Sequence, residues 1–135
     1  MDDLIAFLRA RLDEDEQAAR AATQGKWVWS REFVTPPGYH HRAVGPLEPG
    51  DAAFIARHWP ERALAEVDAK RRLVELHEPV ILHADGGAAY FDTTRVCRSC
   101  EPPKQFPETA YPCATLRLLA LPYAKHPDYR EEWRP

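Results

Sequence analysis

The first 22 residues carry apolar side chains at the spacing of an amphipathic helix. The repeating positions are Leu4, Ile5, Phe7, Leu8 and Leu12. Spacings of three and four place such side chains on one helix face, where they can pack on a core. Gly25 follows, and glycine is common just beyond a helix end because it tolerates a positive φ. The pattern predicts a helix over residues 2–22.

A second helical pattern runs from Pro60 to about His77. Proline suits the first helical position because the N–H it lacks would have no partner there. One ridge of this helix carries Ala63, Val67, Lys70, Val74 and His77. That spacing places His77 on the inward side of the helix end. Two shorter helices are predicted at residues 52–57 and 113–121.

Residues 26–34 have the dense aromatic and β-branched composition of a strand. On a strand, Trp27 and Trp29 share one face. Two tryptophans on one face can form the edge of a core or stack on nucleobases. The segment 35–50 is predicted to be a loop, because it is rich in proline and glycine.

A hairpin is predicted from residues 79–83 and 88–96, around a turn signal at 85–87. The second strand leads directly into Cys97. Residues 101–112 are rich in proline and polar side chains, so we expect a loop there.

Composition limits the possible classes of function. A chain of 135 residues suits one domain, here 1–135. The net charge is −3, from 18 basic and 21 acidic residues, which gives little support to binding driven by phosphate neutralisation. No apolar run approaches the ~20 residues of a membrane span, and the N-terminus lacks the features of a signal peptide. Three cysteines, an odd number, suit a reducing compartment, so we expect a cytoplasmic protein.

The cysteines have the spacing of a metal site. Cys97 and Cys100 form a C-x-x-C pair, and Cys113 follows. Two thiolates on one tight turn point at one centre, and soft donors favour Zn²⁺. A closed structural site needs a fourth ligand, for which His77 is the first candidate and His83 and His126 are the alternatives. We therefore expect a small, mostly helical α+β domain with an antiparallel hairpin carrying a zinc knuckle.

Two other interpretations of the cysteines stay open. A redox C-x-x-C should open a helix after a strand in a βαβ context, whereas this one precedes a proline-rich loop. Three ordinary thiols with no shared role are the other alternative. The chain contains no H-E-x-x-H, P-loop or G-x-G-x-x-G motif, so no catalytic residue is assigned.

The function favoured by these patterns is an interaction or regulatory module with structural Zn²⁺, which binds another protein. A first alternative is a nucleic-acid-binding accessory protein that uses Lys70, Arg71 and Arg72 with Trp27 and Trp29. A second alternative is a zinc-dependent hydrolase with an open metal position. Four protein ligands would leave no such position, so an enzyme is less favoured.

Several segments resemble a family of small uncharacterised proteins of actinobacteria and their phages. They are Met1-Asp2-Asp3-Leu4 through Glu16, His58-Trp59-Pro60-Glu61-Arg62, Lys70 to His77, and Tyr111-Pro112-Cys113 through Trp133-Arg134-Pro135. The resemblance covers most of the chain, with about 26–50 and 79–95 as variable parts. It implies a helix that ends in histidine near 77 and a C-x-x-C before a Pro-Cys, but no activity or substrate. Similar sequences tend to have aspartate in place of Trp59, so a capping side chain for the next helix is missing here.

Overall fold

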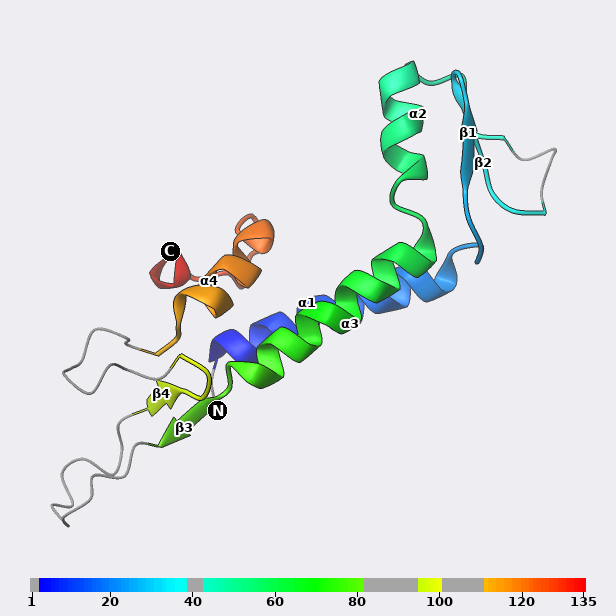
Figure 1. The fold of residues 1–135 in the computed structure, drawn as a ribbon. Helices are drawn as coiled ribbons and strands as arrows, with labels where there is room; N and C mark the ends of the chain where they lie inside the picture. Colours follow the sequence, from blue (N-terminus) through cyan, green and yellow to red (C-terminus); the bar gives the residue numbers. More distant parts are fainter. Residues whose placement is uncertain (1–2, 39–42, 82–94, 101–110) are drawn as a thin grey trace, which may run out of the picture. The chain divides into compact units, whose positions relative to one another are not determined.

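The computed structural model describes residues 3–38, 43–81, 95–100 and 111–135 (Figure 1). The chain forms two compact units. The first consists of Met1–Arg11 with Lys70–Pro135, and the second of Leu12–Ala69. The organisation of residues 1–135 as a single domain stays a prediction.

The first helix, α1, spans Asp3–Ala21 and confirms the helix predicted from the apolar repeat. Its stripe is buried at Leu4, Ile5, Phe7, Leu8 and Leu12. Helix α3 spans Pro60–Leu76 and ends one residue before the predicted His77. The side chains of Val67 and Val74 on its inward ridge are buried, as the spacing predicts.

The second unit contains a hairpin where one long strand was expected. Strands β1 (Val28–Ser30) and β2 (Phe33–Thr35) pair antiparallel, with Trp29 opposite Val34. The prediction of a single strand over 26–34 was therefore wrong. Arg31 lies between the two strands at a φ of 50°, which reverses the chain. Arginine rarely adopts this conformation, so the composition gave no sign of a turn.

Helix α2 spans Pro49–Ala56, shifted towards the N-terminus from the predicted 52–57. Pro49 occupies its first turn, where proline is favoured. The helix lies against β1 and β2, but only Ala52 in it is fully buried. Large apolar side chains of α2 and the hairpin therefore stay exposed.

The first unit contains the second antiparallel pair, β3 (Pro79–Ile81) and β4 (Arg95–Cys97). The predicted turn at 85–87 and the strand residues before 95 lie outside the described residues. Helix α4 (Ala114–Ala120) and two 3₁₀ turns, η1 (Leu121–Tyr123) and η2 (Glu131–Trp133), follow. Helices together with antiparallel strand pairs confirm the α+β fold class.

An aromatic core holds the C-terminal part of this unit to the start of α1. The ring of Phe7 lies 5.1 Å from that of Trp133 and 6.0 Å from that of Tyr129. Leu116 and Ala120 of α4 are fully buried. Within the described ranges, every helix is too short or too polar to cross a membrane.

Candidate metal centre

The pairing of β3 with β4 brings the end of α3 to the C-x-x-C motif. Pro79 lies opposite Cys97, and Val80 lies opposite Val96. His77 precedes Pro79 by two residues, so this register places His77 beside the end of β4. Two residues that are 20 positions apart in sequence therefore meet because of the strand pairing.

The turn after β4 is held by hydrogen bonds to the backbone at the end of α3, on either side of His77. The backbone N–H of Arg98 donates to the carbonyl of Glu78 at 3.0 Å, and the Ser99 hydroxyl donates to the carbonyl of Leu76. The N–H of Cys100 donates to the Cys97 sulfur at 3.4 Å. An N–H···S bond of this kind closes the turn and places both cysteine side chains on one side.

Cys113 reaches the same place from the start of α4. It is the residue that precedes the helix, in an extended conformation. Arg117, one turn into α4, donates from Nε to the carbonyl of Pro112 at 2.9 Å, and its backbone N–H donates to the carbonyl of Cys113 at 3.1 Å. These bonds hold the backbone on both sides of Cys113.

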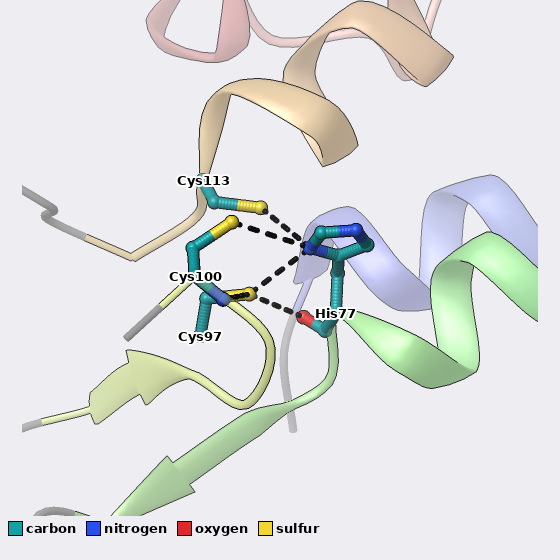
Figure 2. Close-up of side chains that lie close together, drawn as sticks. All are labelled: His77, Cys97, Cys100 and Cys113. Atoms are coloured by element: carbon teal, nitrogen blue, oxygen red, sulfur yellow. Dashed lines mark hydrogen bonds between the residues drawn. The ribbon is translucent and has the colours of Figure 1, made fainter. Parts of the chain in front are cut away.

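Four possible ligand atoms converge at this point (Figure 2). The Nδ1 atom of His77 lies 3.1 Å from the sulfur of Cys97, 3.5 Å from that of Cys100 and 3.6 Å from that of Cys113. All four atoms lie within 4.8 Å of one another. A zinc ion with Zn–S bonds of about 2.3 Å and a Zn–N bond of about 2.0 Å would hold N and S about 3.5 Å apart in a tetrahedron.

Hydrogen bonding alone does not account for the convergence. One Nδ1 has a single proton or a single lone pair, so it can make one good hydrogen bond to sulfur. Here three sulfurs surround the same nitrogen at similar distances. The arrangement can therefore accommodate a metal ion with one nitrogen and three sulfur ligands.

The site is mostly shielded from water. The side chains of Cys97 and Cys113 are 2% and 5% exposed, while Cys100 and His77 are half-buried. All three cysteines are free thiols. Two nearly buried thiols beside a half-buried one suit a closed structural site better than an exposed redox pair.

The pKa values of the Cys97 and Cys100 thiols are shifted in opposite directions. Burial raises the pKa of the Cys97 thiol, but hydrogen bonds from the backbone of Cys100 and Ser99 and from the side chains of His77 and Cys100 outweigh it, so the pKa falls to about 7. Burial, together with the neighbouring sulfurs of Cys97 and Cys113, raises the pKa of Cys100 to about 11. Cys97 is therefore the thiol that most readily supplies a thiolate at neutral pH.

These shifts predict how pH affects the metal-free protein. The lowered pKa of Cys97 contributes stability that is complete above pH 9.0 and is lost as the pH falls through about 7. The raised pKa of Cys100 contributes stability that is complete below pH 9.0 and is lost as the pH rises through about 11. In the presence of a chelator, Tm should therefore decline on both sides of pH 9. Thermal denaturation should show that Cys97→Ser removes the acid-side decline, and a Tm that rises from pH 9 to 7 in the parent protein would contradict the assignment.

The other predicted residues lie elsewhere. His126 is not part of this cluster, because its ring lies 5.7 Å from the ring of Phe7 and contacts the Arg11 guanidinium. His83 lies outside the described residues. The basic triplet at 70–72 belongs to the first unit, while Trp27 and Trp29 belong to the second, so the nucleic-acid interface stays a prediction.

Sequence reasoning missed the polar residue that lies beside the cluster. Glu78 follows His77 and forms ion pairs with Arg9 of α1 at 2.5 Å and with Arg98 of the turn at 3.7 Å. It therefore connects α1, the end of α3 and the turn after β4. No motif marks such a residue, because its partners lie 69 and 20 positions away.

Comparison with known proteins confirms the part of the resemblance that concerns an uncharacterised family. A family model described as a family of unknown function, DUF6221, matches residues 1–135. No curated protein and no solved structure matches the chain. The family match covers every segment that supplies the cluster of His77 and the three cysteines. The chain belongs to the family of unknown function DUF6221.

Proposed function

We propose that this protein is a small interaction or regulatory module held together by a structural zinc ion, with His77, Cys97, Cys100 and Cys113 as the ligands. The observation that supports it is the convergence of three sulfurs around one imidazole nitrogen, at 3.1–3.6 Å. Thiolates with an imidazole in a tetrahedral arrangement favour zinc over the harder ions Mg²⁺ and Ca²⁺.

A structural role is better supported than a catalytic one. Catalytic zinc sites keep one position open for water or substrate, usually with three protein ligands. Here four protein donors lie together, which is enough to fill a tetrahedral coordination shell. Two of the four are almost completely buried, which further limits access of a substrate.

A zinc ion would stabilise a part of the first unit that is weakly held by its own strand pairing. Strands β3 and β4 are three residues long each, and a two-stranded pair of this length is marginally stable alone in water. One zinc ion would cross-link the end of α3, the turn after β4 and the start of α4. Metal binding to such a site contributes directly to folding free energy.

Elemental analysis tests the zinc proposal. Protein purified under reducing conditions should contain about one zinc per chain, and a chelator should remove it. Zinc-free protein that does not bind added Zn²⁺, with an unchanged circular dichroism spectrum and Tm, would contradict the proposal.

A protein partner is supported by the apolar surface of the second unit. Phe54 of α2 is 65% exposed, Trp29 of β1 is 48% exposed and Phe33 of β2 is 41% exposed. The strand register places Trp29 and Phe33 on opposite faces of the hairpin, so these side chains expose apolar surface on more than one side of the second unit. Exposed apolar surface can mark a site of protein interaction. We propose a cytoplasmic location for this interaction, which the free thiols support because they suit a reducing compartment.

Photo-crosslinking tests for this partner. A photoreactive residue at Phe54 should give a discrete protein adduct in cells that express the chain. The same residue at Glu66, which is exposed on α3 in the same unit, should give none. A nucleic-acid adduct from Phe54 would favour the nucleic-acid alternative, and no adduct from Phe54 would contradict a partner at this surface.

A further inference from the structure

The four candidate ligands are divided unequally among the segments of the first unit. Cys97 and Cys100 come from a single turn, whose closing bond joins the Cys100 N–H to the Cys97 sulfur at 3.4 Å. His77 and Cys113 each come from a different helix end. Loss of this one turn would therefore remove half of the ligands at once.

We propose that the metal centre is redox-sensitive: a hydroperoxide oxidises Cys97 and Cys100 to a disulfide, and the zinc ion is released. This inference rests on the proposed zinc site and concerns its regulation. The two remaining donors, His77 and Cys113, are too few to retain a tetrahedral zinc ion.

Exposure identifies the sulfur that meets the oxidant first. Cys100 is half-buried, whereas Cys97 and Cys113 are 2% and 5% exposed. Oxidation of thiolates follows their accessibility as well as their charge, and zinc ligation keeps these sulfurs as thiolates. Cys100 is therefore the expected point of attack.

Chain geometry identifies the sulfur that completes the disulfide. Cys97 lies in the same turn as Cys100, and the Cys100 N–H contacts the Cys97 sulfur at 3.4 Å, so a disulfide between them closes within one turn. Cys113 also has its sulfur within 4.8 Å, but its backbone is held by Arg117 at the start of α4. Pairing with Cys113 would require that helix start to move.

The reaction balances with hydrogen peroxide as the oxidant. The Cys100 thiolate attacks one peroxide oxygen, so an S–O bond forms, the O–O bond breaks and hydroxide leaves. The Cys97 thiolate then attacks the Cys100 sulfur, the S–S bond forms and a second hydroxide leaves. The two sulfurs lose two electrons in total, and the peroxide gains them.

Zinc release would separate the turn after β4 from α4 without unfolding the rest of the unit. The C-terminal residues remain packed on α1 through the contacts of Phe7 with Tyr129 and Trp133. Arg117 also donates from Nη1 to the carbonyl of Glu132 at 3.2 Å. The expected effect is therefore local opening at the cluster.

Treatment of zinc-loaded protein with hydrogen peroxide tests the inference. A chromogenic chelator should detect one zinc released per disulfide formed, and peptide mass spectrometry should locate that disulfide between Cys97 and Cys100. A thiol reductant with added Zn²⁺ should restore the original zinc content. Retention of zinc, release without a disulfide, or a disulfide that includes Cys113 would overturn it.

Two variants with four donors separate the roles of the thiols. Cys113→His keeps the reactive pair and should still release zinc with a disulfide between Cys97 and Cys100. Cys100→His removes the pair and should release zinc more slowly than Cys113→His. Equal release rates from the two variants would contradict the proposal. If a variant does not load zinc, the proposal is tested by the position of the disulfide in the parent protein.

The zinc content before treatment separates the two hypotheses. A parent protein without zinc contradicts the proposed function and this inference together. A parent protein with one zinc that resists peroxide contradicts only the redox step.

Discussion

Replacement of Cys97 by serine is expected to remove stoichiometric zinc and to lower the Tm by about 10 °C or more, because a loss of several kcal/mol has this effect in a chain of this size. Cys97 is 2% exposed, ends β4 and has its sulfur 3.1 Å from the Nδ1 of His77. A hydroxyl is a poor zinc ligand, so three donors would remain. Elemental analysis and thermal denaturation by circular dichroism measure the two effects.

Ser99→Ala is the matched control, since Ser99 lies in the same turn between the two cysteines and supplies no donor to the cluster. It loses the hydrogen bond from its hydroxyl to the carbonyl of Leu76, which contributes about 0.5–1.5 kcal/mol. The control should keep one zinc per chain. If Cys97→Ser keeps its zinc and Tm, or if Ser99→Ala loses as much of both, the assignment of Cys97 as a ligand is wrong.

Leu116→Ala should lower the free energy of unfolding by about 2–5 kcal/mol, because it leaves a cavity in a packed core. Leu116 lies on α4 and is 0% exposed. Zinc content should stay at one per chain, since no ligand is changed. Urea denaturation at saturating zinc, followed by circular dichroism, gives the midpoint and slope that separate a stability change from a change in cooperativity.

Leu118→Ala provides the control in the same helix. Leu118 is 57% exposed, and alanine has the higher helix propensity, so the change should stay within about 0.5 kcal/mol. A Leu116→Ala effect as small as that of Leu118→Ala would mean that α4 does not pack as the structure describes.

The helices were predictable because their signal is local. In α1, the buried side chains recur every three or four residues, and the helix begins and ends within one residue of the predicted bounds. The hairpin of β1 and β2 was not predictable in the same way. Its turn depends on the positive φ of Arg31, a conformation that the residue type does not favour.

The sequence by itself determined the chemistry that is possible at the cluster. The C-x-x-C spacing predicts two thiolates on one turn, and the ridge of α3 places His77 on the inward side of the helix end. These are properties of neighbouring residues, so they can be read without a fold. The choice among His77, His83 and His126 could not be made in that way.

The tertiary structure decided which distant residues meet. The register of Pro79 opposite Cys97 brings His77 to the C-x-x-C motif, and the start of α4 brings Cys113, 36 positions from His77 in sequence. Contacts over such separations depend on strand register and helix packing, which many residues determine together. The residue types and the local spacing were therefore readable from the chain, whereas the convergence of four donors required the fold.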